Sequence, residues 1–171
     1  MSSSVSSDVA YVLKHLDEIT SDKHKHKKHF RVQYNEEESL DGSNRYSKDE
    51  TQLQPQVEVD DVDDKSYRTL IMVDPDAPSS DDPIKGPILH WLVANFQSKD
   101  LKDGHTLYAY KCPAPPVGSG PHRYIFFLYQ SIDKIAEKKI DSEHRLRFPL
   151  QQYVTDNRLG LLSATYFTVD N

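Results

Sequence analysis

The sequence predicts an all-β domain, dominated by strands, because apolar runs of strand length are frequent and helical spacing is scarce. Three such runs lie at residues 69–73, 89–96 and 124–129. The last run consists entirely of aromatic and aliphatic residues, which is typical of a strand covered on both faces. Many strands with few helices favour a β-dominated domain.

Alternation of apolar and polar residues predicts further, half-buried strands. Phe30, Val32 and Tyr34 alternate with polar residues, and Val57 and Val59 do the same. Residues 164–169 predict a final strand, whereas the polar segment 36–50 is expected to form loop or edge structure.

Two short segments carry helical signals. Between residues 8 and 19 the apolar residues recur at helical spacing, and Ser7 is the expected N-cap. Pro149 is well placed for the first turn of a second helix, which we expect to run to about residue 157 and to end at Gly160.

The predicted organisation is an N-terminal part, residues 1–29, followed by a single globular domain, residues 30–171. The N-terminal part contains a Ser-rich tail, the short helix and the segment 22–29, in which three residues are His and four are Lys. His24, His26 and His29 have a spacing that could hold a metal ion. The neighbouring lysines would repel a cation, so a solvated linker is favoured over a metal site or a contact with acidic lipid.

Composition and charge restrict the classes of function. The 171 residues carry a net charge of −6, which argues against general nucleic-acid binding because such binding relies on a basic surface. Cys112 is the only cysteine, so no intrachain disulfide can form. No apolar run approaches the roughly 20 residues of a membrane span, and residues 1–7 lack the apolar stretch of a signal peptide. The expected location is therefore cytoplasmic.

Rigid, turn-rich loops surround the predicted buried strands. Eight of the ten prolines lie between residues 75 and 121. One loop, residues 74–79, directly follows the first buried run, and another, residues 113–123, directly precedes the aromatic run. His90 lies between the two loops, near the start of its own strand. Because proline fixes φ, such loops can hold binding groups without a large ordering cost.

Asp74, Asp76, His90 and His122 are the ionisable residues of interest here, and they allow three interpretations. The first is structural, because Asp is common in turns and a His in a strand is often a satisfied core residue. In the second, two Asp and two His ligate zinc or iron. In the third, the imidazoles and loop N–H groups donate to a phosphate, while the carboxylates orient the imidazoles and accept from an ammonium group.

The chain resembles the phosphatidylethanolamine-binding protein family in two signature segments. The first is DPDAP at residues 74–78, followed at a separation of twelve residues by the His of LHW at residues 89–91. The second is GSGPHRY at residues 118–124, ahead of the aromatic strand. The likeness runs from about residue 30 to residue 169, and the form PAPPVGSGPHRY is similar to the branch that includes fungal carboxypeptidase Y inhibitors.

The resemblance implies a large central β-sheet packed on a smaller sheet, with a few short peripheral helices. It also implies a pocket for phosphate-like anions and phospholipid headgroups, with Asp74, Asp76, His90 and His122 at its polar positions. The residues implied as walls or supports of this pocket are Pro78, Trp91, Pro115, Gly118, Gly120 and Tyr124. No metal or other cofactor is expected. The Ala77–Pro78 bond is a candidate cis peptide, because a tight turn must follow the strand at once.

The favoured function is therefore regulatory binding. An anion pocket would take phosphate or phospholipid headgroups, and the protein would inhibit a partner such as a kinase or a serine protease, with peripheral membrane contact as an option. One alternative is a metal-dependent hydrolase using the Asp/His cluster, but the sequence lacks a nucleophile elbow, an HExxH motif and a P-loop. Another is a structural subunit that reuses the fold.

Ser119 and His122 offer a further enzymatic interpretation, as a nucleophile with its base. Three residues of tight loop are expected to prevent the required contact between hydroxyl and imidazole, and no third, orienting group is evident from the sequence.

Overall fold

The computed structural model describes residues 5–21, 30–139 and 141–171 of the chain. Its helical elements are α1 (Ser7–Thr20), η2 (Asp49–Thr51), η3 (Ser142–Arg145) and α2 (Leu150–Asp156). Its strands are β1 (Phe30–Gln33), β2 (Arg45–Tyr46), β3 (Gln56–Val59), β4 (Tyr67–Asp74), β5 (Ile88–Phe96), β6 (His105–Tyr108), β7 (His122–Ser131) and β8 (Gly160–Val169).

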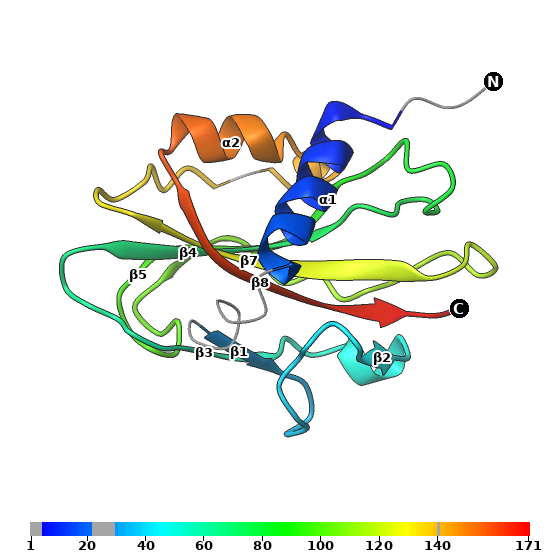
Figure 1. The fold of residues 1–171 in the computed structure, drawn as a ribbon, viewed down its shortest axis with the longest axis horizontal. Helices are drawn as coiled ribbons and strands as arrows, with labels where there is room; N and C mark the ends of the chain where they lie inside the picture. Colours follow the sequence, from blue (N-terminus) through cyan, green and yellow to red (C-terminus); the bar gives the residue numbers. More distant parts are fainter. Residues whose placement is uncertain (1–4, 22–29, 140) are drawn as a thin grey trace.

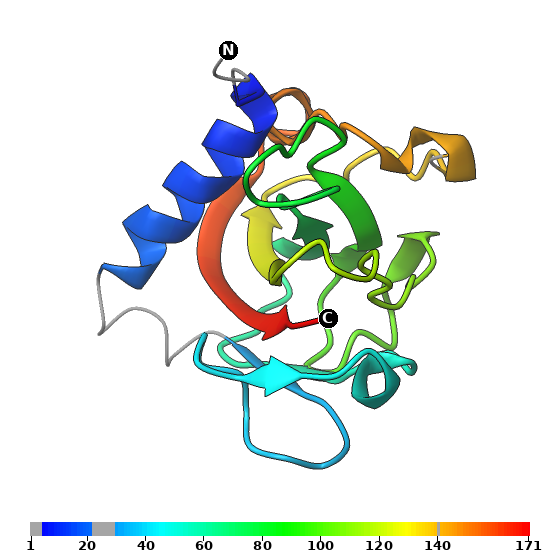
Figure 2. The ribbon, with the colours of Figure 1, turned by 90° about the vertical axis from the view of Figure 1, so that its right-hand side faces the viewer.

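A six-stranded sheet with the order β2-β8-β7-β4-β5-β6 forms the centre of the described structure, and β1 pairs with β3 in a separate two-stranded sheet. Neighbouring strands of the large sheet are antiparallel except β2, which runs parallel to β8. Figures 1 and 2 show α1 and α2 on one side of the large sheet and the small sheet on the other. The expected fold class, a large sheet packed on a smaller one with few helices, is confirmed.

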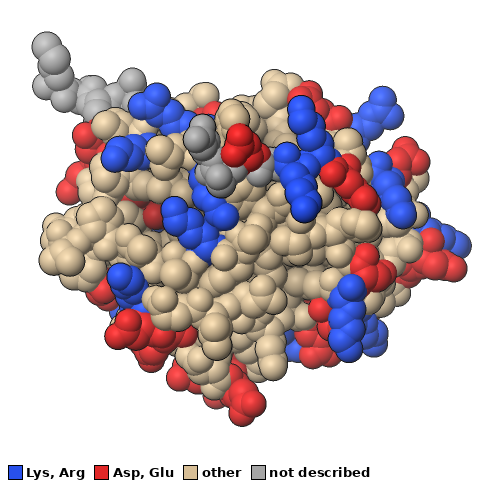
Figure 3. Space-filling model, turned by 180° about the vertical axis from the view of Figure 1, so that it is seen from behind, with Lys and Arg blue, Asp and Glu red and all other residues tan. Residues whose placement is uncertain are grey.

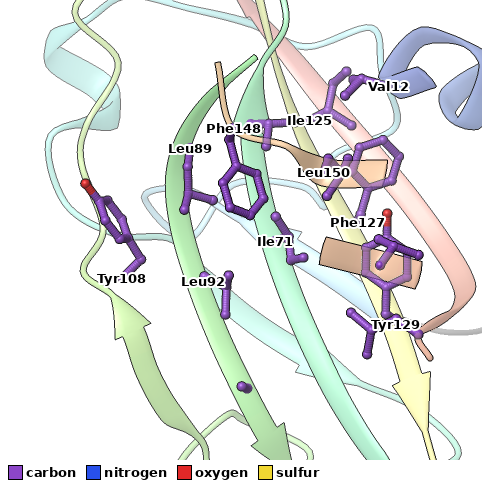
Figure 4. Packing of buried hydrophobic residues seen from close by; sticks show 14 of the residues in the cluster. Val12, Ile71, Leu89, Leu92, Tyr108, Ile125, Phe127, Tyr129, Phe148 and Leu150 are labelled. Atoms are coloured by element: carbon purple, nitrogen blue, oxygen red, sulfur yellow. The ribbon is translucent and has the colours of Figure 1, made fainter. Parts of the chain in front are cut away.

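The central strands bury both faces, which is why they read as continuous apolar runs. On β4 and β7, Ile71 and Phe127 pack with the helices, whereas Leu70 and Phe126 pack with the small sheet. Figure 4 shows how the helix-side residues of three strands meet Phe148 and Leu150. Burying a large aliphatic or aromatic side chain is worth roughly 1.5–3 kcal/mol, so these two clusters provide the main driving force for folding.

A β-bulge in β5 interrupts the regular alternation at His90. Met72 on β4 faces Trp91, and the next residue, Val73, faces Leu89, so His90 is an extra residue without a partner of its own in this register. Leu89 packs on the helix side and Trp91 on the side of the small sheet. Two residues of a regular strand at that spacing would share a face, so the bulge redirects the chain at this point.

Helix α1 packs on the large sheet through its apolar residues. Its apolar residues Val9, Val12 and Leu16 are buried, at 1%, 0% and 5% exposure. The expected N-cap was wrong by one position, because the Ser6 hydroxyl, not that of Ser7, accepts the hydrogen bond from the Val9 N–H at 3.2 Å. The His/Lys-rich segment 22–29 lies outside the described residues. No described helix has both the length and the apolar character that a membrane crossing demands.

The C-terminal third differs from expectation in three respects. Pro149 is the N-cap residue of α2 and so precedes its first turn. Gly160 does not end α2, whose C-cap is Asn157; it opens β8 opposite Gln130. As a consequence β8 has ten residues and begins before residue 164. Pairing with β7 extends β8 beyond its apolar part. Pairing with the edge of β5 likewise forms β6, which local composition did not predict.

Candidate functional site

Asp74 and His122 meet at one end of the large sheet. Because β4 and β7 are antiparallel neighbours, the last residue of β4 lies close to the first residue of β7. His122 Nδ1 is 2.8 Å from Asp74 Oδ2, and the two residues are only 1% and 2% exposed. Figure 2 looks toward this end of the sheet, where the yellow-green loop that precedes β7 crosses in front. Two residues 48 positions apart in the sequence thus form one buried hydrogen-bonded pair.

His90 is buried and donates a hydrogen bond through Nδ1. Its Nδ1 lies 2.7 Å from the backbone oxygen of Lys111, and a carbonyl only accepts, so the proton is on Nδ1 and Nε2 carries a lone pair. Burial lowers the pKa of His90 to about 4, in spite of the hydrogen bond to Lys111 and the nearby charge of Asp74. In its neutral form His90 has one ring proton, which the Lys111 oxygen accepts, so Nε2 is then an acceptor, whereas the anion-pocket interpretation has both imidazoles donating to a phosphate.

His122 has the opposite electrostatic setting. Burial alone would lower its pKa, but the hydrogen bond and the negative charge of Asp74 raise it more, and Asp76 and the backbone of Pro78 add to the increase. The net result is a pKa above the usual value for histidine. One imidazole of the site thus favours the charged form, and the other, His90, favours the neutral form.

Tyr124 packs against both imidazoles. Its ring is edge-on to His90, with 5.2 Å between the centroids and 88° between the planes. The same ring is nearly parallel to His122, with 6.4 Å between the centroids and 19° between the planes. Phe167 stacks on Tyr124 at 5.3 Å. Aromatic packing of this kind holds the rings in fixed orientations.

The loop before β7 brings Ser119 onto His122. The Ser119 Oγ lies 2.9 Å from His122 Nε2. The loop can fold back so tightly because Gly118 and Gly120 have φ values of +78° and +80°, a region that glycine enters without steric cost. The expectation that this contact is prevented was wrong, and the orienting group that the sequence did not reveal is Asp74 on the far side of the ring.

A second side chain reaches Ser119 from the end of β8. The amide of Asn171 donates to Ser119 Oγ at 3.2 Å and also to the backbone oxygen of Pro116. That oxygen additionally accepts the Ser119 N–H at 3.1 Å. The tip of the loop is therefore tied both to itself and to the strand that neighbours β7.

Asp76 supports the site through Arg123. Its carboxylate accepts the backbone N–H of Arg123 at 2.8 Å and, from the guanidinium, Nε–H at 2.9 Å and an Nη2–H at 2.8 Å. Its own N–H donates to Asp74 Oδ1 at 2.7 Å. The oxygens of Asp76 are occupied by Arg123, so the structure places this residue as a support, whereas Asp74 is the carboxylate that orients an imidazole.

The remaining residues assigned to the pocket walls lie in three places. The Ala77–Pro78 bond is cis, as expected, and a second cis bond occurs at Gly86–Pro87. Pro115, Gly118 and Gly120 belong to the loop that holds Ser119. Trp91 stands edge-on to Tyr110 at 5.6 Å and lines a cavity of about 890 Å³ between the two sheets. Trp91 thus contributes to the packing between sheets, and a ligand-binding role for these residues stays a prediction.

Several contacts of the site had no signal in the sequence. The backbone oxygen of Lys111 fixes His90, and a carbonyl group is common to all residue types. Asn171 lies 52 positions from Ser119 and outside both signature segments. Arg123 could have been found, because it is part of the second segment and an acidic partner was available at Asp76.

Candidate metal ligands do not cluster in the described part of the chain. Among the residues that the structure describes, no three His, Cys, Asp or Glu side chains form a group that could hold a metal ion. Charged side chains of both signs are scattered over the face shown in Figure 3, around a broad area that carries neither. The side chains that meet at the end of β4 and β7 are two carboxylates, an imidazole, a guanidinium and a hydroxyl.

Comparisons with known proteins connect this site to a family. The family model of phosphatidylethanolamine-binding protein matches residues 30–167. The "Putative odorant-binding protein A5" of Drosophila melanogaster is 34% identical over 113 residues, which cover 65% of this chain and 53% of that protein. "Protein CENTRORADIALIS-like" of Arabidopsis thaliana is 29% identical over 137 residues, which cover 80% of this chain and 77% of that protein. The chain thus spans about half the length of the fly relative.

Solved structures show the same fold. The carboxypeptidase Y inhibitor, determined in complex with its cognate proteinase, superimposes with a TM-score of 0.76 at 23% identity, over 96% of this chain and 94% of that one. The phosphatidylethanolamine-binding protein from Plasmodium vivax gives a TM-score of 0.71 at 18% identity, over 96% of both chains. The match to the family model over residues 30–167 shows that the chain belongs to the phosphatidylethanolamine-binding protein family.

Proposed function

We propose that this chain is a binding protein and not an enzyme, that its site at the junction of β4 and β7 takes a phosphate group, and that it inhibits a protein partner. The phosphate belongs to a small molecule or to a phospholipid headgroup. The observation that carries the proposal is that two imidazoles with opposite pKa shifts both pack on Tyr124. Asp74 raises the pKa of His122, and burial lowers the pKa of His90.

The two imidazoles suit different parts of a ligand. Protonated His122 donates through Nε2, either directly to a phosphate oxygen or to Ser119, whose hydroxyl then donates onward. Neutral His90 accepts through Nε2 from a group that carries a proton. A phosphate monoanion offers one P–OH group, and phosphorylethanolamine offers an ammonium group. The site should therefore prefer a monoanion or a zwitterion to a fully deprotonated phosphate.

Calorimetry with inorganic phosphate and with phosphorylethanolamine tests this proposal. His122→Ala and His90→Ala should each weaken binding by about 1–3 kcal/mol, the range for a hydrogen bond to a charged group. His105→Ala is the matched control, because His105 has a side chain 52% exposed and pairs with Glu137 on the surface. Unchanged affinity in both site variants would remove the anion pocket from the proposal.

The proposed protein partner is a serine protease. Support comes from the likeness of fold to the carboxypeptidase Y inhibitor, a protein known in complex with its proteinase. Titration of carboxypeptidase Y with this chain should reduce its peptidase activity in proportion to the protein added. If activity stays constant at excess protein, a kinase becomes the partner to examine, since both classes were expected from the signature segments.

We also propose that the protein is cytoplasmic and makes peripheral contact with a membrane. Val117 in the loop before β7 is 96% exposed, two residues from Ser119. An apolar side chain at that position can enter the interface of a bilayer while the site faces a headgroup. Flotation with vesicles of phosphatidylethanolamine and phosphatidylcholine should recover more protein than vesicles of phosphatidylcholine alone, and Val117→Asp should reduce that recovery. Equal recovery in all cases would argue for free phosphate compounds as the ligands.

A further inference from the structure

The contacts of Ser119, His122 and Asp74 form a continuous chain of hydrogen bonds. Ser119 Oγ is 2.9 Å from His122 Nε2, and His122 Nδ1 is 2.8 Å from Asp74 Oδ2. This is the order of groups that activates a serine hydroxyl in hydrolases of several unrelated folds. We propose that Ser119 is a nucleophile, activated by His122 and Asp74, and that the site forms a covalent adduct with activated acyl esters and phosphonyl fluorides.

When His122 is uncharged, the side chains of Ser119, His122 and Asp74 each have a defined role. The His122 Nδ1–H donates to Asp74, so Nε2 holds the lone pair and accepts the hydrogen of the Ser119 hydroxyl. Asp74 is held in turn, because its other oxygen accepts the N–H of Asp76 at 2.7 Å. Asp76 is fixed by Arg123. The base and its orienting carboxylate are thus preorganised by the strands and by the rigid loop after β4.

A reagent can reach Ser119. The residue is partly exposed, whereas His122 behind it is 1% exposed. A Cβ atom added at Gly118 or Gly120 would have no atom outside the adjoining residues within 4 Å, so the two residues that flank Ser119 border on open space. The amide of Asn171, 3.2 Å from the hydroxyl oxygen, also holds Ser119 in position.

The reaction with an activated ester is an acyl transfer to Ser119, and it needs no oxidant or reductant. Ser119 Oγ forms a bond with the carbonyl carbon while its proton passes to His122 Nε2. The bond from the carbonyl carbon to the leaving oxygen breaks, and that oxygen takes the proton and departs as an alcohol or a phenol. The product is a serine ester, and we expect one adduct per chain.

Labelling with an alkyl fluorophosphonate tests the inference. Ser119 Oγ forms a bond to phosphorus, the P–F bond breaks, fluoride leaves, and the hydroxyl proton is passed through His122 to the buffer. Intact mass and peptide mapping should show one adduct on the unmodified protein, located at Ser119. Ser119→Ala should remain unlabelled, and His122→Gln should slow labelling on the order of 10²-fold or more, the contribution of a general base.

Ser79→Ala serves as the matched control. Ser79 also lies in a rigid loop and is also partly exposed, but its hydroxyl contacts the N–H of Asp82 at 3.3 Å. This variant should be labelled at the rate of the unmodified protein. The inference is overturned if the unmodified protein takes up no label, or if Ser119→Ala is labelled as fast as Ser79→Ala. Thermal melting of Ser119→Ala confirms that the variant is folded, since the substituted side chain is partly exposed.

The labelling result is separable from the proposed phosphate site. Phosphate binding is measured by calorimetry without any label, and it depends on His90 as well as on His122. Labelling of Ser119 without measurable phosphate affinity would support the nucleophile and contradict the anion pocket. Phosphate affinity in a protein that resists labelling would support the pocket and contradict the nucleophile.

Discussion

The pairing of Asp76 with Arg123 should be one of the largest single contributions of a polar contact to the stability of this domain. Asp76 accepts three hydrogen bonds from Arg123, one from the backbone and two from the guanidinium. The Asp76 side chain is 4% exposed and that of Arg123 is 36% exposed. Asp76→Ala would leave the guanidinium and one backbone N–H without their acceptor.

The expected cost follows from this burial. Removing one partner of a buried ion pair costs about 3–5 kcal/mol. Since more than a third of the Arg123 side chain faces water, solvent replaces part of the lost interaction, so the lower end, about 3 kcal/mol, applies. In a protein of 171 residues, each kcal/mol shifts the melting temperature by about 2–4 °C, so Asp76→Ala should melt about 6–12 °C below the unmodified protein.

Asp60→Ala provides the matched control. Asp60 receives two hydrogen bonds from one guanidinium nitrogen of Arg31, at 3.2 and 3.0 Å, but the two side chains are 32% and 41% exposed. An exposed pair of this kind contributes about 0.2–1 kcal/mol. Calorimetric melting of both variants decides the point. Equal losses of stability in the two variants would show that burial does not increase the contribution of Asp76 to the free energy of unfolding.

Five further outcomes are expected. Asp74→Asn should lower the pKa of His122 followed by NMR, because burial still lowers this pKa while the carboxylate no longer raises it; an unchanged pKa would contradict the pairing. Because the pKa of His122 is raised in the folded protein, protonation of His122 stabilises the fold. This contribution is present in full below the pKa of free histidine and is lost as pH rises through the raised value. Affinity for phosphate should fall between about pH 6 and 8.5, because His122 loses its charge and the ligand loses the P–OH group that donates a hydrogen bond to His90. A flat profile would contradict this. Gly120→Ala should cost about 1–2 kcal/mol, because φ is +80° there, and should slow labelling of Ser119. Treatment with a chelator should change neither melting nor phosphate affinity, and one zinc or iron per chain by elemental analysis would support a metal-dependent hydrolase instead.

The fold was predictable wherever burial alone determines the structure. The central strands β4, β5 and β7 are covered on both faces, and their apolar runs indicate this directly. Strands that exist through pairing with a neighbour were harder to predict. In β6 only Leu107 and Tyr108 are buried, and the first part of β8 is held by β7, so neither has a strong local pattern.

The resemblance to the family indicated that Asp74 and His122 would lie together, as they do, but it did not indicate the other contacts of these polar residues. Asp74 and Asp76 are both buried, and in the sequence they are equivalent partners for an imidazole. Only the position of Arg123 on β7 decides that Asp76 is engaged elsewhere. The state of His90 depends in the same way on a backbone oxygen, that of Lys111, which no sequence pattern reveals.

The two carboxylates connect stability to the chemistry of the site. Asp76 ties the loop after β4 to β7 through Arg123, and Asp74 ties the end of β4 to His122. The hydrogen bond from the Asp76 N–H to Asp74 Oδ1 joins these two links. A change at Asp76 therefore loosens the orientation of Asp74 even where the ion pair of Asp74 itself is intact. The main-chain N–H of residue 76 is present in both Asp76→Asn and Asp76→Ala, but only Asp76→Asn keeps an acceptor oxygen for Arg123, so it should retain more phosphate affinity than Asp76→Ala. If both variants bind phosphate equally well, the two links act independently, and the orientation of His122 rests on Asp74 alone.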